Sequence, residues 1–211
     1  LIVDALVRAG AGKIMAVIPW FGYSLQDKVF RTGEPIAAKM MAKMISLSGV
    51  SRVFTVDLHS ESVAAFFDVP VMHYSAKELF LAYLKQEIKE KDLVVVSPDF
   101  GAMKKSRQFA QKLDLNQICV NKERDRESGE LTIHGISDPV KGKTCLIFDD
   151  LINTGRTVVQ TAVYLKKQGA AKIYFFASHN LYLKEGFEAL EKSAVAEVIV
   201  TDSVYNREQK S

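Results

Sequence analysis

The fold class follows from one segment of the chain, Cys145-Leu-Ile-Phe-Asp149-Asp150-Leu-Ile-Asn153-Thr154-Gly155-Arg156-Thr157. Four apolar residues predict a strand, two acids emerge at its carboxyl end, and a polar turn leads into a helical pattern. A strand that passes through a short turn into a helix is typical of α/β proteins. Because ligands of open α/β sheets bind beyond the carboxyl ends of the strands, the same segment also predicts where the functional site lies.

The alternation of strand and helix extends outward from this segment over the rest of the chain. Short runs rich in Val, Ile or Phe predict buried parallel strands at Lys13–Pro19, Arg52–Leu58, Asp92–Pro98, Gln117–Val120, Thr144–Phe148, Lys172–Ala177 and Glu197–Thr201. Apolar residues at intervals of three and four predict helices at Pro35–Ser48, Ala76–Lys91, Lys104–Leu113, Thr157–Gln168 and Phe187–Lys192. This order of elements predicts an α/β fold with a doubly wound parallel sheet.

Two helix-to-strand junctions have the same form. Gly49 leads through one predicted strand to His59, and Gly169 leads through another to His179, ten residues on in both cases. Each copy has a glycine that ends a helix, a basic residue, a strand, and polar residues at the carboxyl end of that strand. One interpretation is a repeat of two related α/β domains; the other is that any two helix-strand junctions look alike.

The turn that follows Asp149 and Asp150 suits an anionic sugar. Its backbone N–H groups, its hydroxyls and the start of the next helix favour a phosphate monoester. The two carboxylates can accept hydrogen bonds from the 2- and 3-hydroxyls of a ribose, directly or through a metal. The alternative is an acidic strand end before an ordinary helix capped by Asn153 or Thr154.

Composition narrows the class of protein. The chain has 211 residues of which 48% are hydrophobic, enough for a sizeable core, and its apolar runs are far shorter than the ~20 residues of a membrane-spanning helix. The 28 basic and 25 acidic residues are interspersed, which favours anionic small substrates over nucleic acid. Cys119 and Cys145 lie in apolar runs as free thiols, which predicts a reducing, cytoplasmic setting. The start at Leu1 without Met predicts processing or truncation.

The segment around Asp149 and Asp150 resembles the phosphoribosyl pyrophosphate-binding signature of the phosphoribosyltransferase fold. Four further segments resemble ribose-phosphate pyrophosphokinase: Pro19–Lys28 with Glu34-Pro35-Ile36, Val56–His59 with Phe66–Pro70, Ser97–Ala102, and Lys122-Glu123-Arg124. The resemblance implies two tandem doubly wound parallel-sheet domains of phosphoribosyltransferase type. We expect the first at residues 1–74, incomplete because an amino-terminal segment is absent, and the second at residues 75–211 with the ribose 5-phosphate loop.

The resemblance also implies an activity and the residues that carry it. Members transfer the diphosphate of ATP to the 1-hydroxyl of ribose 5-phosphate, which gives phosphoribosyl pyrophosphate and AMP for nucleotide biosynthesis. It implies catalytic roles for Lys122 and Arg124, on a flexible flap over residues 121–130, and Mg²⁺ as cofactor, handled by His59 and Asp99. The implied ATP-binding residues are Gln26, Asp27 and His59, and the implied ribose 5-phosphate-binding residues are Arg124, Asp149, Asp150, Asn153, Thr154, Gly155, Arg156 and Thr157.

Several positions depart from the family pattern: Leu25 stands where an arginine is usual, Asn153 where many members have Asp, and Arg156 where Gly is usual. After His179, a usual Gly and a later Gly-Pro are replaced by Asn180 and by Lys184-Glu185-Gly186. Two other functions stay open. One is a phosphoribosyltransferase, which consumes phosphoribosyl pyrophosphate and shares the phosphate-binding signature. The other, which the departures favour, is a weakly active regulatory homologue of the synthetase. The family also implies a homo-oligomer, whereas the interspersed charges and the short apolar runs predict neither nucleic acid nor a membrane as partner.

Overall fold

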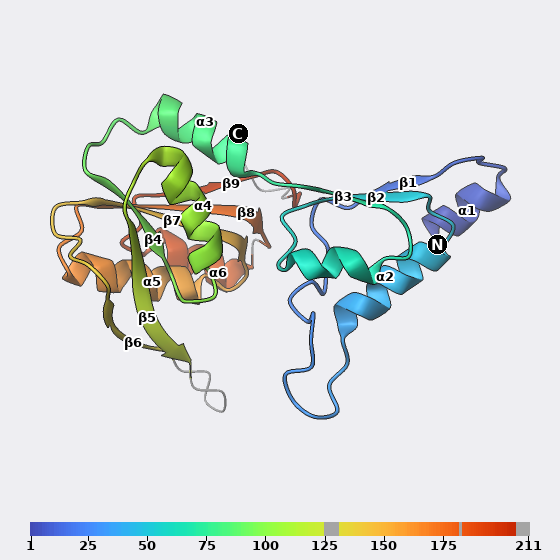
Figure 1. Cartoon of the computed structure of the whole chain (residues 1–211), viewed down its shortest axis with the longest axis horizontal. Coiled ribbons are helices and arrows are strands. Elements are labelled where there is room, and N and C mark those ends of the chain that lie inside the picture. Colours follow the sequence, from blue (N-terminus) through green and yellow to red (C-terminus); the bar gives the residue numbers. More distant parts are fainter. Residues whose placement is uncertain (125–130, 182, 206–211) are drawn as a thin grey trace. The chain divides into compact units, whose positions relative to one another are not determined.

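The computed structural model describes residues 1–124, 131–181 and 183–205, with the side chains of residues 123, 124, 131, 184, 185 and 187 left undescribed. The described chain divides into two compact units. Unit 1 comprises Leu1–Ala76 with Ser203–Tyr205, and unit 2 comprises Lys77–Asp202. Figure 1 labels the elements of both units, each of which is described by itself.

Unit 2 contains a six-stranded sheet with the order β6-β5-β4-β7-β8-β9. Its strands are β4 (Leu93–Ser97), β5 (Gln117–Arg124), β6 (Leu131–Ile136), β7 (Thr144–Ile152), β8 (Lys172–Asn180) and β9 (Glu197–Val200). All neighbours pair in parallel except β5 and β6, which form an antiparallel ribbon. The expected α/β fold with a parallel sheet is therefore confirmed.

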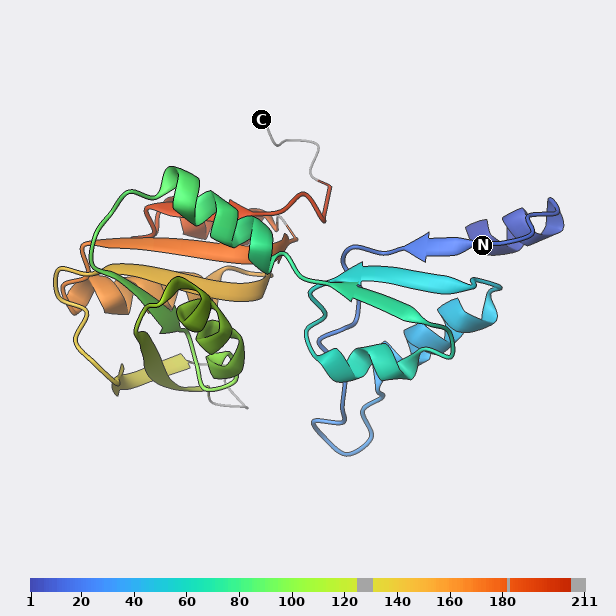
Figure 2. The same cartoon turned by 45° about the horizontal axis from the view of Figure 1, so that its top comes forward.

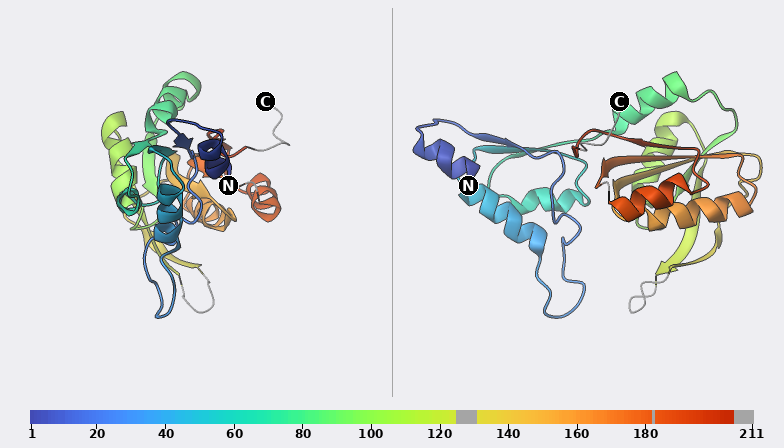
Figure 3. Two further views of the ribbon diagram at one scale, coloured as in Figure 1. Left: turned by 90° about the vertical axis from the view of Figure 1, so that its right-hand side faces the viewer. Right: turned by 180° about the vertical axis from the view of Figure 1, so that it is seen from behind.

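Four helices cover the two faces of this sheet: α3 (Lys77–Glu87), α4 (Met103–Leu113), α5 (Arg156–Lys167) and α6 (Lys184–Glu191). Helices α3 and α4 lie on one face, and α5 and α6 lie on the other, as the front view in Figure 1 and the back view in Figure 3 show. Because helices lie on both faces, the sheet is doubly wound, as predicted.

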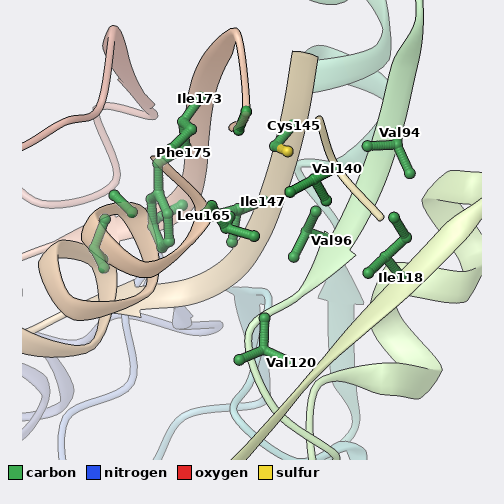
Figure 4. Packing of buried hydrophobic residues seen from close by; sticks show 14 of the residues in the cluster. Val94, Val96, Ile118, Val120, Val140, Cys145, Ile147, Leu165, Ile173 and Phe175 are labelled. Atoms are coloured by element: carbon green, nitrogen blue, oxygen red, sulfur yellow. The ribbon is translucent and has the colours of Figure 1, made fainter. Parts of the chain in front are cut away.

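Alternation along β7 divides the core of unit 2 between these two faces. Cys145 and Ile147 are fully buried in the cluster that includes Leu165 of α5 and its neighbours on β8, drawn in Figure 4. Phe148 points the other way, where it stacks on Phe109 of α4 with ring centroids 3.7 Å apart. Successive side chains of a strand point to opposite faces, so a strand buried on both faces reads as a continuous apolar run.

Unit 1 contains a smaller, three-stranded parallel sheet with the order β1-β2-β3 (Figure 2). Its elements are α1 (Ile2–Arg8), β1 (Met15–Val17), α2 (Ala37–Leu47), β2 (Arg52–Val56), the 3₁₀ helix η1 (Glu61–Phe66) and β3 (Val71–Tyr74). Ala38 and Ala42 of α2 pack with Val53 of β2 and Val63 of η1 in its core. This core sets the positions of the loops that follow β1 and β2.

The structure also differs from the predicted elements in several places. Strands β3 and β6 were not predicted, and α6 begins at Lys184, three residues before the predicted start at Phe187. Strand β5 continues to Arg124, so the first residues of the predicted flap belong to a β-ribbon, and residues 125–130 lie outside the described part. No helix within the described residues is long and apolar enough to span a membrane.

Candidate active site

The strand order of unit 2 brings three charged segments to one edge of the sheet. Strand β4 pairs in parallel with β5 on one side and with β7 on the other, so the carboxyl ends of all three strands point the same way. Asp99 follows β4, Lys122 lies near the end of β5, and the acid pair lies near the end of β7. Residues that are far apart in sequence thus meet at the edge where α/β proteins bind ligands.

The acid pair is Asp149, which is half-buried, and Asp150, which is buried. The backbone N–H of Asp150 donates a hydrogen bond to Asp149 Oδ1 at 2.9 Å. Burial and the neighbouring charge of Asp150 raise the pKa of Asp149 to about 7, well above its ordinary value of 3.8. Two adjacent carboxylates in a shielded place disfavour a double negative charge, so the pair suits a ligand that supplies hydroxyl donors or positive charge.

Lys105 of α4 lies against this pair and was missing from the sequence-based site. Its Nζ lies 3.1 Å from Asp150 Oδ1, and its side chain is about one third exposed (34%). The cation also lowers the pKa of Asp149, although burial and Asp150 outweigh it. The sequence signal that identifies Lys105 is its place one helical turn before the buried Phe109, which sets it on the sheet-facing side of α4.

A second ion pair joins Asp99 to Lys122. Lys122 Nζ lies 3.0 Å from Asp99 Oδ2, and the lysine side chain is only 9% exposed. The other carboxylate oxygen, Asp99 Oδ1, accepts the backbone N–H of Ala102 at 2.8 Å, at the start of α4. Lys122 is therefore a shielded cation at the sheet edge.

The turn after β7 has no side-chain cap within the described residues. The N-cap of α5 is Gly155, which adopts a left-handed conformation (φ +69°) and has no side chain to offer. The alternative of a helix capped by Asn153 or Thr154 is thus not what the structure has. Asn153, Thr154 and Arg156 are exposed and Thr157 is half-buried, so the start of α5 presents both charge and hydroxyls.

Helix α6 packs closely against the backbone of the turn that follows β7. A Cβ atom at Gly186 would lie 3.1 Å from Asn153 O and 3.1 Å from the carbonyl carbon of Thr154. A Cβ atom at Gly155 would in turn lie 3.1 Å from Gly186 O. Two glycines therefore allow the backbones of the turn and of α6 to touch. The earlier start of α6 brings Gly186 into this contact.

The predicted ATP-binding residues lie in unit 1, in two loops held by the backbone. Ala38 N donates to Gln26 O at 3.2 Å, which ties the loop of Gln26 and Asp27 to the start of α2. His59 is exposed and follows Asp57, whose Oδ2 accepts the N–H of Ala76 at 2.9 Å. The backbone N–H of Leu58, between Asp57 and His59, donates a hydrogen bond to His73 Nε2 at 3.0 Å, a contact that the sequence did not predict.

The predicted residues thus fall into two groups. Unit 1 holds Gln26, Asp27 and His59, whereas unit 2 brings Asp99, Lys122, Asp149, Asp150 and the turn to one sheet edge. The joint action of His59 and Asp99 on a metal remains a prediction, since they belong to different units. Arg124 ends β5, and its side chain lies outside the described part of the chain.

Comparison with known proteins identifies the family. A family model described as the N-terminal domain of ribose phosphate pyrophosphokinase matches residues 1–49, and one described as the phosphoribosyl synthetase-associated domain matches residues 131–211. The chain is 36% identical over 211 residues to the ribose-phosphate pyrophosphokinase of Fusobacterium nucleatum and 37% identical over 210 residues to that of Caldanaerobacter subterraneus. All of this chain is matched, and it spans 66% of the length of each of these relatives.

A solved structure gives the same answer. The crystal structure of phosphoribosylpyrophosphate synthetase from Mycobacterium smegmatis matches with a TM-score of 0.89 and 32% sequence identity. The match covers 100% of this chain and 68% of that one. The resemblance seen in the sequence is confirmed by these matches, and the chain belongs to the ribose-phosphate pyrophosphokinase family.

Proposed function

We propose that the protein is a ribose-phosphate diphosphokinase, which transfers the diphosphate of ATP to the 1-hydroxyl of ribose 5-phosphate. The observation that carries the proposal is the edge of the unit 2 sheet, where a shielded acid pair lies near the end of β7 and an uncapped helix start follows that strand. The acids suit a ribose diol and the helix start suits its 5-phosphate. Family membership supports ATP as the second substrate.

The sugar phosphate would bind across the turn after β7. Asp149 and Asp150 accept hydrogen bonds from the diol, and the N–H groups and hydroxyls of residues 153–157 donate to the phosphate. Arg156, at the first position of α5, adds a positive charge to this turn. Arg156 stands where family members usually have Gly, so it strengthens the electrostatic attraction for a dianion.

Transfer itself depends on positioning and on charge. The oxygen of the 1-hydroxyl forms a bond to the β-phosphorus of ATP, the bond from that phosphorus to the oxygen shared with the α-phosphate breaks, and AMP leaves as the hydroxyl proton is released. Negative charge spreads over the oxygens of the transferred group in such a reaction. Lys122 and Arg124 would stabilise that charge, and a lysine shielded from water does so more strongly.

Magnesium fits the residues that are present. Asp99 offers a hard carboxylate ligand that already binds one cation, Lys122, in the structure. Among the described residues no group of three or more His, Cys, Asp or Glu forms a metal cage. Mg²⁺ commonly binds through one or two carboxylates together with substrate phosphates, and a bound ion would neutralise the phosphate charge. Asp99 of unit 2 would be a ligand of the ion, and His59, Gln26 and Asp27 of unit 1 would contact ATP.

The test is an assay with ATP, ribose 5-phosphate and Mg²⁺ that measures AMP release. We expect AMP only when both substrates are present, together with phosphoribosyl pyrophosphate in equal amount. A phosphoribosyltransferase would instead bind phosphoribosyl pyrophosphate tightly without ATP and release no AMP from this mixture.

A regulatory homologue would bind ribose 5-phosphate without turnover. Two features favour this second function: Leu25, whose exposed side chain replaces the usual arginine beside Gln26, and Asn153, which stands where many members have Asp. Restoring the arginine with Leu25→Arg would then raise AMP release from a low level. The family also suggests self-association, which sedimentation of the protein with and without ATP would measure.

A further inference from the structure

Lys105 is the cation that contacts the acid pair, and no segment that carries the family resemblance includes it. Its Nζ approaches Asp150 Oδ1 to 3.1 Å, and the Asp150 side chain is only 10% exposed. A buried carboxylate that lacks a cation or a hydrogen-bond donor is destabilised, because it loses much of its hydration and no protein contact replaces it. The contact therefore has a larger effect than a surface ion pair.

The position of Lys105 is set by the packing of α4 on β7. Lys105 and Phe109 are four residues apart on the helix, and Phe148 and Asp150 are two residues apart on the strand. These spacings correspond to about 6 Å along a helix and about 6.7 Å along a strand, so the two pairs match. Phe109 stacks on Phe148 with ring centroids 3.7 Å apart. Because the spacings match, this packing places Lys105 in contact with Asp150.

The start of α4 is held by the other half of the site. Asp99 Oδ1 accepts the N–H of Ala102, and Ser97 Oγ donates to Asp99 O at 2.7 Å. The end of β4 thereby fixes the helix one turn before Lys105. These contacts link Lys105, the start of α4 and the acid pair, and the ion pair of Lys122 with Asp99 is the second ion pair of this set.

We propose that Lys105 is a positioning residue of the sugar-phosphate site, which holds the Asp150 carboxylate charged and oriented for the ribose diol. The inference rests on the proposed function of the β7 turn. A carboxylate accepts hydrogen bonds at about four lone-pair positions, so the bond from Lys105 leaves room for hydroxyl donors. Lys105 acts through Asp150 and does not touch the phosphate. The lowering of the Asp149 pKa by Lys105 agrees with this arrangement.

The test compares Lys105→Met and Lys105→Arg with a control, Lys112→Met, at the exposed far end of the same helix. Calorimetry of the whole protein would measure affinity for ribose 5-phosphate, inorganic phosphate and ATP. We expect Lys105→Met to weaken ribose 5-phosphate about 10- to 100-fold, the effect of one lost charge-assisted bond. Phosphate and ATP affinities should change less than about threefold, Lys105→Arg should recover most of the binding, and Lys112→Met should match wild type.

A cycle with Asp150→Asn separates positioning from direct attraction of the phosphate. If Lys105 acts through Asp150, Lys105→Met changes the affinity less than about twofold in the Asp150→Asn background. Equal losses in both backgrounds, or an equal loss of inorganic phosphate binding, would overturn the inference. Lys105→Gln replaces Lys105→Met if thermal melting shows that the latter is unfolded. Wild-type protein that fails to bind ribose 5-phosphate overturns the proposed function itself, whereas wild-type binding with an unchanged Lys105→Met overturns only the role of Lys105.

Discussion

The two units contain junctions of the same form that end differently. Gly49 after α2 and Gly169 after α5 both adopt positive φ angles, +104° and +87°, and the next strand begins three residues later in each. Ten residues after each glycine stands a histidine. His59 is exposed beyond the end of β2, whereas His179 is buried inside β8.

The difference arises from strand length and neighbours. Strand β2 has five residues and ends at Val56, so His59 falls in the following loop. Strand β8 has nine residues and stays paired with β7 as far as Asn180, with His179 opposite Leu151, whereas its pairing with β9 ends at Ala177. The distance from a helix cap therefore does not decide whether a residue can reach a ligand. The length over which neighbouring strands pair does.

The largest expected effect is on kcat, and it distinguishes Lys122 and Arg124 at the sheet edge of unit 2 from an exposed lysine elsewhere in the same unit. Lys122→Ala and Arg124→Ala should each lower kcat about 10²- to 10³-fold, because each removes a positive charge that would stabilise the negative charge developing during transfer. KM for either substrate should change much less. Lys112→Ala, at the far end of α4, should keep wild-type turnover. Steady-state kinetics with thermal melting measure this, and normal kcat in both Lys122→Ala and Arg124→Ala would remove their catalytic role.

The next effect is on ribose 5-phosphate affinity, and it compares hydroxyl groups after β7 of unit 2 with one after β2 of unit 1. Thr154→Ala and Thr157→Ala should each weaken ribose 5-phosphate binding by about 1.5–3 kcal/mol, the value of a hydrogen bond to a charged group. ATP affinity should change little. Ser60→Ala, in the loop after β2, is the matched change in unit 1 and should leave ribose 5-phosphate affinity unaltered. Calorimetry that finds equal losses at Ser60 and Thr154 would remove the distinction between the units.

The free energy of unfolding tests the difference between the buried His179 of β8 and the exposed His59 after β2. His179→Ala should destabilise the protein by about 1–3 kcal/mol, because the change truncates a buried side chain and leaves a cavity in its place. His59→Ala, at an exposed position, should cost less than about 0.5 kcal/mol and affect only ATP handling. Urea unfolding of both variants gives the free energies. A larger cost at His59 would mean that its loop, and not the strand, carries the structure there.

The acid pair can be tested in the same way, through a pH dependence of stability caused by Asp149. Its pKa in the fold, about 7, lies above the ordinary value of 3.8, so the charged form is disfavoured in the folded protein. The free energy of unfolding should fall as pH rises from about 4 to about 7. Asp149→Asn removes this contribution and should make the stability flatter over that range. Melting temperatures across the range check it, and parallel curves for both proteins would speak against the raised pKa.

Local pattern predicted the parts of the fold whose residues are buried on both sides. Strands such as β4 and β7 are continuous apolar runs, and the turn at Asn153–Thr157 has a strong motif. Strand β3 was missed because three of its four side chains are exposed and no alternation marks it. Strand β6 was missed because it is an antiparallel edge strand with His134 and Gly135 within it.

The site was predictable where its residues are close in sequence. Asp149, Asp150 and the turn belong to one motif, and Asp99 and Lys122 were found through resemblance. Their ion pairs were not predictable, since the contacts Lys105 to Asp150 and Lys122 to Asp99 depend on how α4, β4, β5 and β7 pack. Such long-range pairs require the strand order, which no local pattern contains.

Amide hydrogen exchange with each substrate tests the account most directly. The central claim is that the end of β7 holds the sugar phosphate and that the loops of unit 1 do not. Saturating ribose 5-phosphate should slow exchange in residues 149–158 and leave residues 57–61 unchanged, and inorganic phosphate should protect only the turn at 153–158. Protection of residues 57–61 by ribose 5-phosphate, with no change at residues 149–158, would contradict the claim.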